Sequence, residues 1–198
     1  MNKILLSIVA VLTVCFTACA QNKDKQNMSN NSSKALIAYF SATGTTAKAA
    51  RSIADITGGE LFEIEPQDSY TDADLDWNNR QSRSSLEMNN PQARPALKGT
   101  KADMAAYDVI FIGYPIWWDL APHIINTFIE SHDLKGKTLV PFATSGGSGI
   151  SNSVRKLRET YPNLKWQEGK LLNGTSRTAI QKWVRDMENF KACVREDQ

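Results

Sequence analysis

A short apolar run that breaks into a hydroxyl-rich turn is the feature that most constrains this chain. Residues Ala35–Phe40 are apolar and rich in strand-forming side chains, which predicts a buried strand of a parallel sheet. A helical pattern follows the turn, so unpaired N–H groups and the positive end of the helix dipole should lie at the strand's carboxyl end. We therefore expect the turn to bind an anion, most simply a phosphate, through Ser41, Ala42, Thr43, Gly44, Thr45 and Thr46. The alternative is that these hydroxyls only cap the helix.

The composition of this turn excludes two common nucleotide sites. It has no lysine, so it differs from the phosphate loop of nucleotide hydrolases, which ends in Gly-Lys-Ser or Gly-Lys-Thr. It has one glycine, whereas the dinucleotide-binding fingerprint has three. Hydroxyl donors without a cation suit a phosphate that is bound and kept rather than transferred.

The start of the chain has the pattern of a secretory signal. A positive Asn2-Lys3 precedes the apolar run Ile4–Ala18, which is short for a membrane span. The run ends in Phe16-Thr17-Ala18-Cys19, which resembles the lipobox of bacterial lipoproteins, with Phe16 in place of the usual leucine. We therefore expect residues 1–19 to be a signal peptide and Cys19 to be lipidated. A soluble secreted protein cut near Ala20 is the alternative.

The next segment, residues 20–33, is polar and has almost no side chains that could form a core, so we expect a flexible tether. The protein would then be exported and anchored by lipid to a bacterial membrane, on the periplasmic side or at the outer membrane. Residues 34–198 remain for one domain. The formal net charge of +2 and the lack of a basic run give no reason to expect a nucleic-acid partner.

Strand and helix patterns alternate from Lys34 onward, which predicts a doubly wound α/β domain with a five-stranded parallel sheet and helices on both faces. The long polar segment Pro66–Thr100 is expected to contain a helix at Leu75–Met88 and to serve as a functional or covering element. The further strands are expected at Glu60–Glu65, Asp108–Tyr114, Thr138–Ala143 and Trp166–Leu172. A last helix is expected after Asn173-Gly174, with one apolar face formed by Ile180, Trp183, Val184, Met187 and Phe190.

Three unusual loops each follow one of these strands. The first is the hydroxyl-rich turn, the second is Pro115–Trp118 with two tryptophans, and the third is Thr144–Gly149 with three glycines. Because the carboxyl ends of parallel strands meet at one edge of the sheet, the three loops should converge there. They predict a ligand with a phosphate at one end and a flat aromatic system at the other, as in a mononucleotide-like cofactor.

The motifs SATGTT, GYPIWW and FATSGGSGI, in this order, resemble those of flavodoxins, in a branch with a Pro-Ile-Trp-Trp second loop. The resemblance covers Lys34–Phe190 and implies a short-chain flavodoxin-like domain with strand order 2-1-3-4-5 and non-covalently bound FMN. It implies that the first loop binds the FMN phosphate, and that Pro115, Ile116, Trp117 and Trp118 lie against the isoalloxazine. It further implies that the ring's polar edge is contacted by Thr144, Ser145, Gly146, Gly147 and Ser148.

Two functions fit this resemblance. The first is an electron carrier that exchanges electrons with a membrane or periplasmic partner, and the alternative is an FMN-dependent NAD(P)H or quinone oxidoreductase. Neither requires an acid, base or nucleophile from the protein, so we nominate no catalytic residue and no metal ligand. We expect His123 and His132 to lie on the surface. A phosphorylated receiver domain is disfavoured because Gly113-Tyr114-Pro115 stands where its acceptor aspartate would be.

Overall fold

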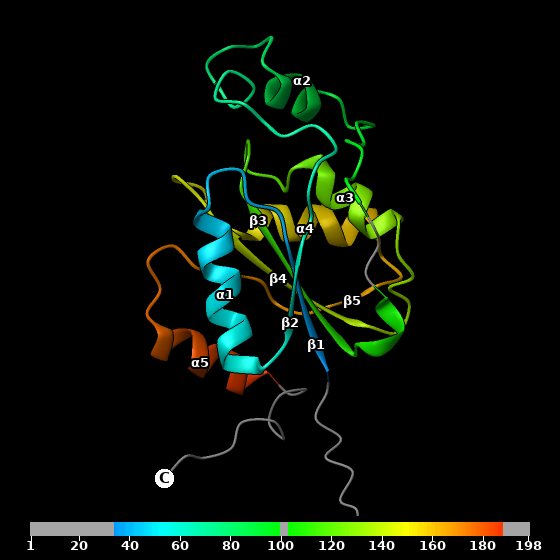
Figure 1. The fold of residues 1–198 in the computed structure, drawn as a ribbon, viewed down its shortest axis with the longest axis vertical. Coiled ribbons are helices and arrows are strands. Elements are labelled where there is room, and N and C mark those ends of the chain that lie inside the picture. The colour runs from blue at the N-terminus through cyan, green and yellow to red at the C-terminus, as the bar shows by residue number, and fades with distance from the viewer. Residues whose placement is uncertain (1–33, 100–102, 188–198) are drawn as a thin grey trace, which may run out of the picture. The chain divides into compact units, whose positions relative to one another are not determined.

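The computed structural model describes residues 34–99 and 103–187 (Figure 1). The expected signal peptide, the expected lipidation site Cys19, the expected tether and Phe190, which is expected on the last helix, lie outside these residues. Within the described part of the chain, no helix has the length and apolar character needed to cross a membrane.

A parallel sheet in the order β2-β1-β3-β4-β5 forms the centre of the described domain, and this confirms the predicted fold class (Figure 1). A further short strand, β6, pairs with β4 beyond the end of β5. The strands are β1 (Ala35–Tyr39), β2 (Glu60–Glu63), β3 (Val109–Pro115), β4 (Thr138–Thr144), β5 (Lys165–Trp166) and β6 (Lys170–Leu171). The central strands β1, β3 and β4 are almost entirely buried, as their apolar sequences require.

Helices cover both faces of the sheet and divide the core in two. Side chains of α1 and α5 pack on one face, and side chains of α3 and α4 pack on the other. The helices are α1 (Thr45–Thr57), α2 (Arg83–Asn89), α3 (His123–Glu130), α4 (Ser151–Thr160) and α5 (Arg177–Asp186), with a short 3₁₀ turn, η1, at Met104–Ala106. Gly58 adopts a left-handed conformation directly after α1 and ends that helix, as its Gly-Gly sequence predicts.

A glycine in β3 permits close packing at the centre of the sheet. A Cβ atom on Gly113 would lie 2.1 Å from Cζ of Phe142, so the aromatic ring occupies the space that any other residue would fill. Gly113 and Phe142 are also register partners in the β3–β4 pair. The Phe142 ring can therefore lie across β3 at Gly113. This contact allows close packing near the carboxyl ends of β3 and β4.

The segment between β2 and η1 differs from the sequence prediction. We call residues 66–99 the excursion; they leave the sheet and return beside their own start, where Gln67 N donates to Ala96 O at 2.8 Å. The prediction of a helix at Leu75–Met88 is wrong in its start, because α2 begins only at Arg83. Side chains of Asp76 and Asn79 accept hydrogen bonds from backbone N–H groups two residues onward, at 3.0 and 2.9 Å, and these local bonds favour turns over a helix.

The edge strand expected at Trp166–Leu172 is interrupted into β5 and β6. Gln167 N donates to Leu139 O, and Leu172 N donates to Ala143 O. Every second residue of β4 therefore directs its backbone hydrogen-bonding groups toward the edge strand. Pro141 lies between those two acceptors and has no N–H to offer the neighbouring strand. The ladder therefore breaks at Pro141, and the edge segment holds one extra residue there, as in a β-bulge.

Candidate functional site

A pocket of about 610 Å³ lies where β1, β3 and β4 end, and all three predicted loops line it. Its polar groups are mainly hydroxyls and amides, and no charged side chain occurs among the described residues that line it. It is lined by Ala42, Thr43, Thr45, Leu75, Trp77, Ser84, Pro115, Ile116, Trp117, Trp118, Thr144, Ser145, Gly146 and Asn173.

The first loop divides its hydroxyls between the pocket and its own support. Thr43 and Thr45 are exposed and line the pocket, with their Oγ1 atoms 3.4 Å apart. Ser41 Oγ instead accepts from Ala47 N at 3.1 Å, so the capping alternative holds for this residue. Thr46 is buried, and its Oγ1 lies 2.8 Å from Thr144 Oγ1. That bond joins the first loop to the third.

Gly44 stands directly before α1 with a φ of 82°, in the left-handed region that glycine adopts without steric cost. It does not line the pocket. This glycine therefore allows the sharp turn from β1 into the helix, and the turn directs the helix N-terminus toward the pocket edge.

The two tryptophans of the second loop have different environments. Trp117 is half-buried and packs edge-on against Phe40 and Tyr70, with ring centroids 5.6 and 5.3 Å away. Trp118 is 47% exposed. Trp117 and Leu120 close a two-residue hairpin through backbone hydrogen bonds of 3.0 and 2.9 Å.

The turn of this hairpin is strained. Trp118 and Asp119 have φ values of 46° and 63°, in the left-handed region that costs a non-glycine residue about 1–2 kcal/mol. Such strain persists only where the surroundings hold it, and it is concentrated at functional sites. Trp117 therefore anchors the loop through its packing, and the turn holds Trp118 at the pocket with its side chain exposed to solvent.

The third loop is held by a residue that sequence reasoning did not select. Ser145 N donates to Asn173 Oδ1 at 2.7 Å, and Asn173 Nδ2 donates back to Ser145 O. Ser145 Oγ accepts from Gly147 N at 3.1 Å, which tightens the turn. Ser145, Gly146 and Thr144 line the pocket, whereas Gly147 and Ser148 lie outside its lining.

The excursion supplies one wall of the pocket through Leu75, Trp77 and Ser84. Tyr70 anchors this wall to the second loop, because its ring packs on Trp117 and its hydroxyl donates to Glu87 Oε2 at 2.5 Å. Arg83 lies over the Tyr70 ring, with its guanidinium carbon 4.0 Å from the centroid. Burial and the Glu87 carboxylate raise the pKa of Tyr70, so its hydroxyl stays protonated and remains a donor at neutral pH.

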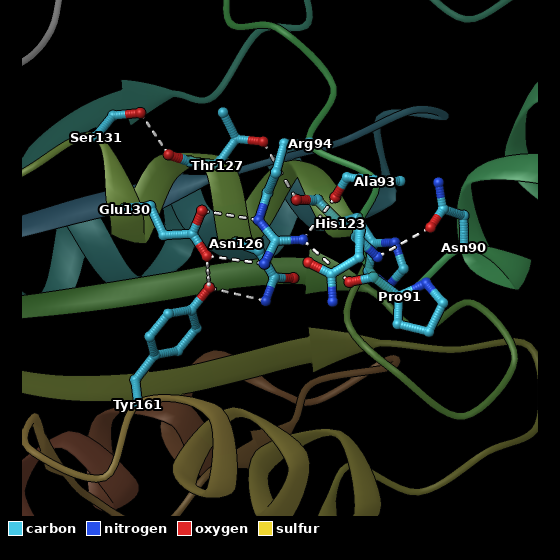
Figure 2. Close-up of polar contacts among 11 residues, drawn as sticks. Asn90, Pro91, Ala93, Arg94, His123, Asn126, Thr127, Glu130, Ser131 and Tyr161 are labelled. Carbon is cyan, nitrogen blue, oxygen red and sulfur yellow. Dashed lines mark hydrogen bonds and ion pairs between the residues drawn. The ribbon is translucent and has the colours of Figure 1, made fainter.

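A second anchor fastens the returning arm of the excursion to α3 and α4 (Figure 2). Arg94 donates from Nε and Nη2 to the two carboxylate oxygens of Glu130, at 2.8 and 2.9 Å. Tyr161 OH donates to Glu130 Oε1 at 2.7 Å and accepts from Asn126 Nδ2 at 2.9 Å. Because the Arg94 pair is bidentate, it fixes orientation as well as distance.

The prediction of a surface position is wrong for His123. Only 9% of this residue is exposed. Glu87, Asn90 and Arg94 of the excursion lie beside its ring. Burial lowers the pKa of His123 and favours its neutral form. His132 is half-buried, with Nδ1 2.7 Å from Phe128 O. Neither histidine lines the pocket.

The comparisons with known proteins identify the family. A flavodoxin family model matches residues 34–187, so the chain belongs to the flavodoxin family. Two crystal structures of proteins designated flavoproteins share high identity with it. That from Bacteroides eggerthii is 64% identical, with a TM-score of 0.75 over 77% of this chain and 96% of the other. That from Bacteroides uniformis is 54% identical, with a TM-score of 0.76 over 78% and 99%.

A more distant match is a flavoprotein from Lactobacillus acidophilus whose crystal structure is a complex with FMN. It is 25% identical, with a TM-score of 0.61 over 76% of this chain and 98% of the other. A search of curated proteins finds no match.

The Arg94–Glu130 anchor leads to a prediction about stability and pH. Hydrogen bonds from Arg94 hold the pKa of Glu130 below its ordinary value of 4.5. The ionised Glu130 therefore stabilises the fold above pH 4.5, and this stabilisation is lost as the pH falls through the lowered pKa. We expect Glu130→Gln to lower the free energy of unfolding by about 1 kcal/mol at pH 7 and by much less at pH 3. Urea unfolding at both pH values measures this.

A matched control is Glu159→Gln, because Glu159 pairs with Arg155 in an exposed pair within α4. That change should cost less than about 0.5 kcal/mol at either pH. Equal effects of Glu130→Gln at pH 7 and pH 3 would contradict the assigned role of the Arg94 pair.

Proposed function

We propose that this protein binds FMN in the pocket at the carboxyl ends of β1, β3 and β4 and transfers electrons through it. The convergence of three loops on one pocket of about 610 Å³ carries this proposal. The volume lies within the range of about 300–1,000 Å³ that is typical of small-molecule and cofactor sites. Membership of the flavodoxin family and the FMN complex of the Lactobacillus acidophilus protein support the choice of cofactor.

The residues of the pocket suit each part of FMN. Two exposed hydroxyls, Thr43 and Thr45, stand at the N-terminus of α1, where a phosphate is favoured by the helix dipole and by free backbone N–H groups. Trp117, Trp118 and Ile116 form an apolar side that suits the isoalloxazine. The third loop offers backbone groups and small side chains toward the ring's polar edge.

The bound flavin would supply the one- or two-electron chemistry, and the protein would hold and tune it. The lack of charged residues in the described pocket lining means that phosphate binding relies on dipoles and hydroxyls rather than on a cation. Trp118 is exposed at the edge of the pocket, which suits electron exchange with a partner that approaches from solvent. We further propose that Cys19 is lipidated, so that the domain works on the exported side of a bacterial membrane.

A second candidate function is an FMN-dependent NAD(P)H or quinone oxidoreductase on the same fold. The observation in its favour is the excursion, which adds Leu75, Trp77 and Ser84 as a further wall of the pocket. A wall beyond the three loops encloses space beside the cofactor that a small-molecule substrate could use.

Replacement of the two exposed hydroxyls tests the phosphate assignment. Thr43→Val combined with Thr45→Val should weaken FMN binding by about tenfold to a hundredfold, because it removes hydrogen bonds to a charged group. Titration of the apoprotein, followed by quenching of flavin fluorescence, gives the dissociation constant. Thr160→Val, an exposed threonine at the end of α4, is the control and should leave it unchanged. An FMN affinity unchanged by the double substitution would remove the phosphate assignment.

Lipidation can be tested by metabolic labelling in a bacterial host with radioactive palmitate. The full-length chain should incorporate label and sediment with membranes, whereas Cys19→Ser should do neither, because it lacks the thiol that becomes acylated. Equal labelling of the two proteins would contradict an anchor at Cys19, and Cys15→Ser then identifies whether the neighbouring cysteine is the acceptor.

Steady-state turnover separates the two candidate functions. We expect the FMN-loaded protein, freed of contaminating reductases, to oxidise NADH or NADPH in the presence of a quinone only if it is an oxidoreductase. A carrier should accept electrons from dithionite yet show no catalytic oxidation of either nucleotide. Turnover that persists at constant specific activity through purification would contradict the carrier function.

A further inference from the structure

A second hollow adjoins the cofactor pocket on the side of the excursion. It has a volume of about 520 Å³ and is lined by Trp77, Asn78, Arg80, Ser85, Asn89 and Trp118. We call it the Trp77 groove. Trp77 and Trp118 line both the Trp77 groove and the cofactor pocket, so a molecule in the groove would lie next to a flavin bound in the pocket.

Two indole rings in the Trp77 groove face solvent. Trp77 is 71% exposed and Trp118 is 47% exposed, although both are large apolar side chains. The backbone holds them there: the strained hairpin fixes Trp118, and the turn before Trp77 is fixed by Asp74, whose carboxylate accepts from Thr71 N and Oγ1 at 2.9 and 2.7 Å. Exposed tryptophans at a groove suit a flat aromatic ligand that stacks on them.

The remaining residues of the Trp77 groove are polar, and one is cationic. Arg80 is exposed and forms no salt bridge with any other described residue. The nearby acidic residues Asp76 and Asp119 do not line the groove, and Asp76 already accepts from Asn78 N at 3.0 Å. An arginine without a carboxylate partner beside two indoles favours a ligand that carries a negative group on or near its ring.

We propose that the Trp77 groove binds a planar aromatic anion, with the ring against Trp77 and Trp118 and the anionic group at Arg80. This inference rests on the proposed function, because it assigns the ligand to the small-molecule redox partner of the flavin. A pyridine nucleotide, with its phosphates, and an aromatic carboxylate or sulfonate share this chemistry.

Calorimetric titration with oxidised probes tests the proposal without turnover. Anthraquinone-2-sulfonate and NADP⁺ are the anionic probes, and 2-(hydroxymethyl)anthraquinone is the uncharged counterpart of the first. Trp77→Ala and Arg80→Gln should each lower the affinity for the anionic probe that binds by about tenfold. The first substitution removes the stacking contact, and the second removes the charged hydrogen bond. Trp77→Phe keeps an aromatic face and should restore most of the affinity.

Arg185→Gln is the matched control for Arg80→Gln. Arg185 is an exposed arginine in the last turn of α5, which Figure 1 shows at the opposite end of the domain from α2. It should leave the affinity for every probe within about twofold of the unsubstituted protein. Arg80→Gln should likewise leave the affinity for the uncharged probe unchanged, because that probe has no group for Arg80 to pair with.

The FMN content of each protein, read from its visible absorption, separates the two proposals. Unsubstituted protein that fails to retain FMN contradicts the proposed function. The titrations of Arg80→Gln on FMN-free protein still report on the groove, because Arg80 lines the groove and does not line the cofactor pocket. If NADP⁺ binds and its affinity depends on Trp77 and Arg80, the groove is assigned to a nucleotide. If only anthraquinone-2-sulfonate binds with this dependence, the groove is assigned to a simple aromatic anion. Binding of neither probe, or affinities indifferent to both substitutions, overturns the inference.

Discussion

The parallel register of β1, β3 and β4 is the constraint on which the rest of the structure depends. Their pairing places Tyr39 beside Gly113 and Pro115 beside Thr144, so the three strands end together at one edge of the sheet. The loops that follow them must then meet, whatever their sequences. The buried bond between Thr46 and Thr144 fastens the first loop to the third at that edge. The pocket is thus a consequence of strand pairing, and the loop sequences determine what it can hold.

The excursion converts this common edge into a site with a wall of its own. It has an aromatic anchor and an ionic anchor: Tyr70 packs on Trp117, which lines the pocket, and Arg94 pairs with Glu130 on α3. Together they connect the turns that bear Trp77 to the same strands that carry the loops. A pocket built only from the three loops would suffice for a bound flavin, whereas the added wall and the adjoining Trp77 groove are features that a small partner molecule could use.

Local patterns in the sequence predict the sheet, the α1 helix and most of the loop residues at the pocket, because apolar runs and helix signals depend on near neighbours. Most of what they miss depends on residues far apart in the chain, and the exception is the path of the excursion. The excursion turns where a helix was expected because acidic and amide side chains bond the backbone locally, and His123 is buried because the excursion covers it. Asn173 binds Ser145 from 28 positions away, a separation that no local pattern spans. Pro141 lies in β4, yet the strand that it interrupts is the neighbouring edge strand, which is divided into β5 and β6.

The visible absorption spectrum of the purified protein decides whether the pocket holds FMN. The protein is mixed with FMN, the excess is removed by gel filtration, and the spectrum is recorded before and after reduction with dithionite. We expect a retained flavin spectrum that bleaches on reduction. A colourless protein that is still folded by circular dichroism would contradict this expectation, because the three converging loops would then serve a ligand other than FMN.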